Sequence, residues 1–195
     1  MAFATCRLNR NFRLRFSATS QSPEPLAVSV TDDFTTMKRI VLISCVSRKG
    51  TTKAKAKDLY KGPLFTNSLT YGQALNPDKI FILSAHYHLL DLDKEIEPYD
   101  VTLSYVSPEK RKKKPKLKVL TKDEARKWGQ EVLKQLDVFA DLRNDTFIIL
   151  AGQSYLEPIQ NGLTKIEEPL KGIVQAKRPG KLKELLSKIN DKRTA

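Results

Sequence analysis

Three short runs of apolar residues mark the chain, at residues 40–45, 79–84 and 146–151. Each run is continuous rather than alternating, which is typical of a strand buried on both faces. Helices are predicted between and after these runs, from apolar positions at helical spacing or from sequence that favours a helix, over residues 66–75, 121–142 and 181–190. Strands separated by helices predict an α/β fold: one Rossmann-like, three-layer domain with a mainly parallel central sheet in which the three strands are adjacent.

Local signals place the ends of these elements. The turn sequence at residues 76–78 ends the first helix. Thr121 and Glu124 have the spacing of a capping box, in which side chain and backbone groups satisfy each other at a helix start. Ser154 and Glu157 repeat that spacing and predict a further helix. Residues 86–100 show no regular pattern and are predicted to be irregular.

Residues 1–36 differ from the domain predicted over residues 37–195. Residues 1–23 contain arginine, serine and threonine but no acid, the composition of an organelle transit peptide. The segment is either a targeting or disordered leader, or an over-extended start with Met37 as the initiator. Two cysteines, Cys6 and Cys45, exclude a disulfide framework and favour a reducing compartment. No apolar run approaches a membrane span, so we expect a cytoplasmic protein, with an organelle as the alternative.

Positive charge is the main compositional feature. Lys and Arg outnumber Asp and Glu by 35 to 22, and the pI is about 9.7, which favours polyanionic partners such as nucleic acid or nucleotides. Residues 109–118 carry seven cations and one anion inside a segment, residues 107–120, that its prolines and like charges predict to be a loop. It is either a solvated loop or a nucleic-acid contact, with these candidates: Lys110, Arg111, Lys112, Lys113, Lys114, Lys116 and Lys118.

Small and polar residues follow each predicted strand. In parallel sheets the ligand crevice lies outside the carboxyl ends of the strands, so these residues are candidates for substrate binding. After the first strand, Ser47, Arg48 and Lys49 resemble an anion-binding nest. The candidates at the other two strand ends are Ser84, Gly152, Gln153 and Tyr155. We expect Cys45, Ser47, Ser84, Tyr99 and Gly152 to surround one pocket.

Cys45 and His86 are candidate catalytic groups. Cys45 ends a predicted strand before a basic loop, where cations would favour a reactive thiolate, and His86 would act as a base. The alternative is that Cys45 is a small buried filler, the commoner role of this residue type. His86 and His88 have metal-pair spacing, but no third ligand at fixed spacing accompanies them. We therefore assign neither a metal nor a cofactor.

Residues 98–100 suggest a nucleobase site. The Tyr99 ring offers a stacking face, and the Asp100 carboxylate would act as a base or stabilise a cation. Tyr60 would frame the base from a second side. The alternative is structural, with Asp100 capping a turn and Tyr99 closing the core.

Six motifs, in order along the chain, resemble a bacterial and phage family catalogued as domain of unknown function 6884. They are Ser44-Cys45 with Ser47 and Lys49, residues 56–60 with Leu64-Phe65, residues 82–85 with Leu89-Leu90, residues 98–103, residues 151–155, and residues 169–172. That family is distantly similar to the YaaA group of peroxide-stress, DNA-binding proteins and, more loosely, to nucleobase-handling enzymes. The resemblance implies a Rossmann-like domain with a polar cleft. His86 and His88 stand where the family usually has a basic residue and a glycine.

Two functions are compatible with these residues. The first is an enzyme that processes nucleotides or nucleic acid, cleaving or exchanging an N-glycosidic bond, with Lys49 holding a phosphate and Asp100 stabilising oxocarbenium charge. The second is a non-catalytic nucleic-acid-binding module, related to stress or defence, that uses the basic segment.

Overall fold

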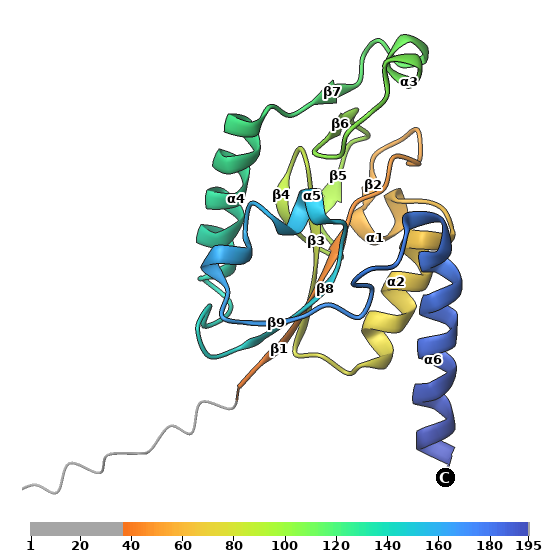
Figure 1. Cartoon of the computed structure of the whole chain (residues 1–195), viewed down its shortest axis with the longest axis vertical. Helices are drawn as coiled ribbons and strands as arrows, with labels where there is room; N and C mark the ends of the chain where they lie inside the picture. Colours follow the sequence, from red (N-terminus) through yellow and green to blue (C-terminus); the bar gives the residue numbers. More distant parts are fainter. Residues whose placement is uncertain (1–36, 195) are drawn as a thin grey trace, which may run out of the picture. The chain divides into compact units, whose positions relative to one another are not determined.

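The computed structural model describes residues 37–194, which form a three-layer α/β fold around a five-stranded sheet (Figure 1). The predictions for residues 1–36 lie outside the described residues. The strand order is β4-β3-β1-β8-β9. The strands are β1 (Arg39–Ser44), β3 (Lys79–Ser84), β4 (His88–Asp91), β8 (Thr146–Leu150) and β9 (Lys165–Glu167). Within this sheet the neighbouring strands are parallel, except that β3 and β4 are antiparallel.

The three predicted strands are confirmed as the centre of this sheet. β1 lies between β3 and β8, with Leu42 opposite Phe81 on one side and Ile149 on the other. These apolar side chains are buried on both faces of the sheet, which explains why the strands read as unbroken apolar runs.

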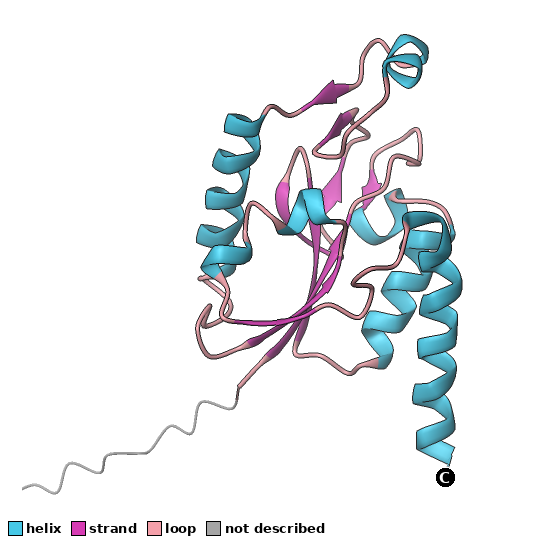
Figure 2. Cartoon of the chain, viewed as in Figure 1, coloured by secondary structure: helices cyan, strands magenta, loops and turns pink. Residues whose placement is uncertain are grey.

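Helices cover both faces of the sheet (Figure 2). Helix α4 (Lys122–Leu136) packs on one side against β4, while α2 (Pro63–Ala74) packs against β1 and against α6 (Arg178–Thr194) on the other. Shorter elements connect them. These are α1 (Ala56–Leu59), α3 (Pro108–Lys113), α5 (Gln153–Leu156), the 3₁₀ turns Gln160–Gly162 and Gln175–Lys177, and the strands β2 (Ala54–Lys55), β5 (Glu95–Ile96), β6 (Val101–Thr102) and β7 (Lys118–Val119).

Helix α4 begins as its sequence predicts. The Thr121 side chain accepts from the Glu124 backbone N–H at 3.3 Å, and the Glu124 carboxylate accepts from the Thr121 N–H at 2.9 Å. Trp128, Val132 and Leu136 form its buried stripe. The helix ends at Leu136, earlier than the predicted residue 142, and turns follow it. The buried Asp145 carboxylate then accepts from the Asp141 and Lys38 N–H groups.

Three local predictions are wrong. Residues 86–100 contain the antiparallel edge strand β4 and the short strand β5. Part of the basic segment is helical, because Pro108 stands at the first helical positions of α3, where a missing N–H costs nothing. The helix predicted after the third strand is confirmed as α5, but its N-cap residue is Gly152, and the predicted side-chain cap at Ser154 does not form.

Candidate functional site

A network of hydroxyl groups closes the carboxyl end of the sheet. Ser84, the last residue of β3, is fully buried and donates from Oγ to the Tyr99 hydroxyl at 2.7 Å. The hydroxyls of Tyr99 and Tyr60 are 2.8 Å apart. Ser84 Oγ also accepts from the Tyr87 N–H at 3.0 Å, in the tight turn that leads into β4. Ser84 therefore binds Tyr99 directly, and through Tyr99 it is linked to Tyr60 at the end of the sheet.

A second set of contacts joins this network to β1, α4 and α5. Cys45 follows β1, and its Sγ lies 3.1 Å from the hydroxyl of Tyr155 in α5. The Trp128 indole meets the Tyr155 ring edge-on, with centroids 5.7 Å apart, and donates from Nε1 to the Ser84 carbonyl at 2.8 Å. Cys45 is buried, which limits the access of a ligand to its sulfur.

The three tyrosines are neutral at physiological pH. Burial, followed by the influence of Cys45, raises the pKa values of Tyr60, Tyr99 and Tyr155 above the usual value for a phenol. Since an anionic phenolate is disfavoured, these groups serve as hydrogen-bonding hydroxyls rather than as bases.

Lys49 and His86 lie against the Tyr99 ring. The Lys49 ammonium is 4.2 Å from the ring centroid, within cation–π range, and burial lowers the pKa of Lys49, while Cys45 and Asp100 act in the opposite direction. The exposed His86 ring stacks on Tyr99 with centroids 5.2 Å apart and planes at 28°. Lys49 and His86 thus already contact the Tyr99 ring on which a nucleobase was expected to stack. Of the two stacked rings, His86 is the exposed one.

Tyr60 does not offer a face to a ligand in this structure. Its side chain is buried and its ring packs on Phe65 at 5.2 Å between centroids. It is linked to the site by its hydroxyl contact with Tyr99 and by the Lys49 ammonium, which lies 5.8 Å from its ring centroid.

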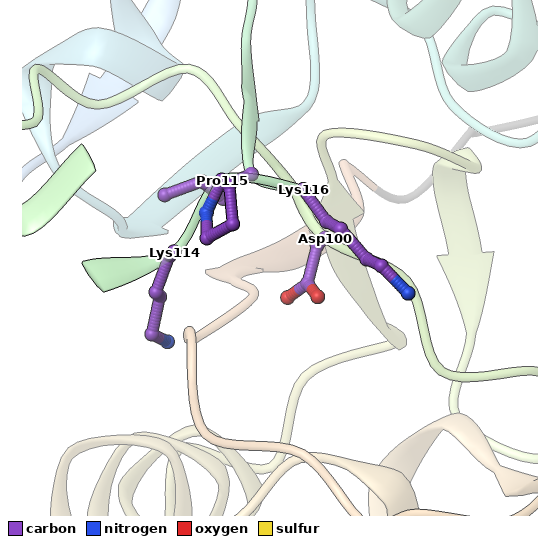
Figure 3. A pocket seen from close by; sticks show the side chains of 5 residues that line it. Asp100, Lys114, Pro115 and Lys116 are labelled. Atoms are coloured by element: carbon purple, nitrogen blue, oxygen red, sulfur yellow. The ribbon is translucent and has the colours of Figure 1, made fainter. Parts of the chain in front are cut away.

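Asp100 borders a surface hollow of about 340 Å³ whose other lining residues are Lys114, Pro115, Lys116 and Leu117, just before β7 (Figure 3). Its exposed carboxylate points into the space between the Lys114 and Lys116 side chains. Asp100 and Lys114 both influence the pKa of Lys49, in opposite directions, so the three charges act on each other. A carboxylate and several cations therefore meet beside the Tyr99 stack.

The basic segment stands away from the core. No side chain of α3 is buried, and the residues from Pro108 to Lys116 are exposed. Lys118 differs, since its ammonium pairs with the Glu124 carboxylate at 2.6 Å. Six of the seven predicted phosphate contacts form no ion pair within the described part of the chain, namely Lys110, Arg111, Lys112, Lys113, Lys114 and Lys116.

The two histidines do not form a shared ligand pair on one strand. His86 is in the turn, and His88 begins β4 with a positive φ of 62°. The nearest acidic residues along the chain, Asp91 and Asp93, pair with Lys79 and Lys57 at 2.8 Å. Within residues 37–194 no group of three potential ligands is placed to hold a metal ion.

At the end of β8, Gly152 and Gln153 open helix α5, and Gln153 Nε2 donates to Glu168 Oε2 at 3.1 Å. Ser47 and Arg48 are exposed on the loop after β1. The structure thus brings Cys45, Ser84, Tyr99 and Tyr155 into one connected set. Ser47, Arg48 and Gln153 do not take part in this set, and their roles in substrate binding stay predictions.

Sequence reasoning missed Arg178. Its guanidinium donates to the carbonyl oxygens of Ala151 at 3.0 Å and Ile173 at 2.9 Å, beside Gly152 at the carboxyl end of β8. Because Arg178 is 27 residues from Ala151 in sequence, no local pattern could have pointed to it.

These features define a Rossmann-like α/β domain with an aromatic, hydroxyl-rich and basic site at the carboxyl edge of its sheet. The chain belongs to a family of unknown function, DUF6884, whose sequence pattern matches residues 40–184. No curated protein matches the chain. Among residues 37–194, no helix is long and apolar enough to cross a membrane. The more distant similarity to the YaaA group stays a prediction.

Proposed function

We propose that the protein binds nucleic acid or nucleotides through their phosphates, at the basic surface formed by Lys49, α3 and residues 114–116. The observation that carries the proposal is a set of six exposed cations that form no ion pair with any residue of 37–194, two of which, Lys114 and Lys116, line the Asp100 hollow. Unpaired cations on an exposed segment add little to the stability of a fold. They give a polyanion a surface on which each phosphate contact releases counterions.

The location proposed with this function is the cytoplasm. Cys45 is a free thiol in the described residues, which fits a reducing compartment where nucleic acid and nucleotides are abundant.

A salt titration tests the proposal. Affinity for a fluorescent oligonucleotide should fall with salt, at a log–log slope of about −0.9 per phosphate contact for duplex DNA. Replacing Lys112, Lys113 and Lys114 with Ala should make the slope shallower by about two to three units, because each lysine contributes about one contact. Fluorescence anisotropy across a salt series measures both slopes.

A matched control removes the same charge elsewhere. Lys127, Lys134 and Lys183 are exposed on α4 and α6 and form no ion pair within the described residues. Replacing these three with Ala should leave the slope near the wild-type value. Equal slopes for both triple variants would show that the basic segment makes no special contact and would contradict the proposal.

A second candidate function is cleavage or exchange of an N-glycosidic bond. The specific observation in its favour is the exposed Asp100 carboxylate, one residue from Tyr99 and facing the hollow. In such a reaction the carboxylate stabilises the oxocarbenium-like charge on the sugar or orients the attacking water. Lys49 and Lys114 hold the phosphate of the substrate, and His86 presents its ring to the base.

Asp100→Asn separates this candidate from binding alone. The substitution should slow release of free base from nucleoside 5′-monophosphates by about 100-fold or more, the range for loss of a positioned acid or base. Oligonucleotide affinity should be unchanged or higher, because a negative charge beside Lys114 is removed. Chromatography of the released base measures the rate. Release by the variant at the wild-type rate, or none above blank by the wild-type protein, would exclude the catalytic role.

A further inference from the structure

Residues 104–117 form an arm whose two ends are tied to the domain by one pair of short strands. Strands β6 and β7 pair in parallel at its base, where the Lys118 N–H donates to the Asp100 carbonyl and the Leu120 N–H to the Thr102 carbonyl, each at 2.9 Å. Leu103 is buried and anchors the side at which the chain leaves. In Figure 1 the arm, with α3 at its tip, extends beyond the end of the central sheet. The base is fixed while the arm itself reaches outward.

Tyr105 is an exposed aromatic side chain on this arm. It is 81% exposed, more than any other large hydrophobic side chain in the described residues. It takes part in no hydrogen bond or ring contact within residues 37–194, whereas Tyr60, Tyr99 and Tyr155 are all engaged in the network at the sheet edge. Both faces of its ring are therefore available to a flat partner.

Five consecutive cations begin five residues after Tyr105, at Lys110–Lys114. Successive residues of a helix point about 100° apart, so the cations of α3 project around the axis rather than along one stripe. Helix α3 spans six residues, which is about 9 Å of helix. An aromatic ring and a short, strongly basic helix thus share one small arm.

We propose that the arm binds single-stranded nucleic acid, with an unpaired base stacked on Tyr105 and the flanking phosphates on the cations of α3. This inference rests on the proposed function and names its substrate class. A single strand fits because stacking on a side chain needs a free base face, and within a duplex both faces are covered by neighbouring base pairs. Recognition is tolerant of sequence, since every base has such a face.

Substitutions at residue 105 test the ring directly. Tyr105→Ala should weaken binding of a 20-nucleotide oligo-dT or oligo-U by about five- to tenfold, as expected for loss of one stacked base. Its effect on a blunt duplex of equal length should be less than twofold. Tyr105→Leu keeps an apolar side chain without a π face and should behave like Ala, whereas Tyr105→Trp should retain or improve single-strand affinity.

The Trp variant also provides a spectroscopic readout. The chain has one tryptophan, Trp128, which is buried, so wild-type fluorescence should change little on binding. In Tyr105→Trp, stacking should quench the new indole as oligo-dT is added. All variants should keep the wild-type melting temperature, because an exposed side chain without contacts is replaced.

The possible failures are distinguishable. Equal losses for single strand and duplex in Tyr105→Ala, or no loss in either, would overturn the single-strand assignment and leave the phosphate-binding function intact. No binding of any nucleic acid by the wild-type protein at low salt would overturn the proposed function and this inference with it.

Discussion

At the scale of single residues, Tyr99 connects the hydroxyl network to the exposed side chains of the site. Its hydroxyl meets Ser84 and Tyr60, while its ring meets Lys49 and His86. The ring and the hydroxyl of Tyr99 therefore have different structural roles. The hydroxyl fixes the side chain to the end of β3, and the ring positions a cation and an exposed imidazole beside the Asp100 hollow.

Removing hydroxyls should show this difference in stability. Tyr99→Phe should lower the free energy of unfolding by about 1–3 kcal/mol, because Ser84 Oγ and the Tyr60 hydroxyl both lose their partner. Tyr60→Phe should cost less, about 1 kcal/mol, since Tyr99 keeps its bond from Ser84. Urea denaturation of both variants measures the order. A larger loss for Tyr60→Phe would show that Tyr99 does not hold the network together.

Lys49 adds an electrostatic feature at the same scale. Its lowered pKa means that the unfolded chain holds this proton more tightly, so the burial of Lys49 opposes folding at neutral pH and less so as the pH rises toward 10.5. The cation–π contact with Tyr99 offsets part of that cost. A charge kept at a cost to folding is consistent with a role in binding phosphate.

At the scale of elements, helix α4 depends on its first turn. The pKa of Glu124 is lowered to about 2, first by the Lys118 ammonium and then by the Thr121 N–H. Glu124 thus ties β7 to the start of α4, and it connects the base of the basic arm to the layer of helices.

Substitutions in that turn should show a defined pH dependence. Thr121→Ala should destabilise the protein by about 1 kcal/mol at pH 7, the usual cost of losing an N-cap. Glu124→Gln should also destabilise it at pH 7. Since the pKa of Glu124 is lower in the folded state, its contribution is complete above the ordinary value of 4.5 and is lost as the pH falls toward 2. Thermal melts of wild type and Glu124→Gln should therefore converge at the acid end, and a constant difference would contradict this account.

The elements also show which patterns can be interpreted from sequence. Strands β1, β3 and β8 were predictable because burial on both faces requires unbroken apolar residues. Strand β4 was not, since His88 and Asp91 make it look like a polar loop and its pairing comes from the adjacent strand β3. Helix α3 was missed because like charges normally oppose a helix, and here Pro108 starts one without any buried face.

The same contrast holds for the site. The rule that ligands bind at the carboxyl ends of parallel strands pointed to Cys45, Ser84 and Gly152. The direction of each side chain depends on packing between distant segments, so the contact of Cys45 with Tyr155 and the position of Arg178 could not be derived from sequence. Burial of Tyr60 likewise follows from α2, which brings Phe65 against its ring.

At the scale of the whole molecule, charge and stability are carried by different parts. The core around β1, β3 and β8 holds the fold together, while residues 104–116 carry six cations and one anion and contribute no buried side chain. The base of the arm is held by the β6–β7 pairing and by Leu103, which lie outside this stretch. Binding and folding should therefore be separable by removing the arm alone.

Replacing residues 104–116 with a Gly-Ser linker of the same length makes that separation. Strands β6 and β7 pair in parallel, so the chain between them has to cross from one end of the pair to the other, and the unchanged length lets them still pair. The free energy of unfolding should change by less than about 1 kcal/mol, because the loop keeps its length and no buried side chain is lost. Nucleic-acid binding at physiological salt should fall below detection, and the salt dependence that remains should be that of Lys49 and scattered surface cations. Urea denaturation and oligonucleotide anisotropy on the same preparation measure both. A stable variant that binds as tightly as wild type would place the nucleic-acid surface elsewhere on the domain, whereas a loss of several kcal/mol would show that the arm is part of the folded core.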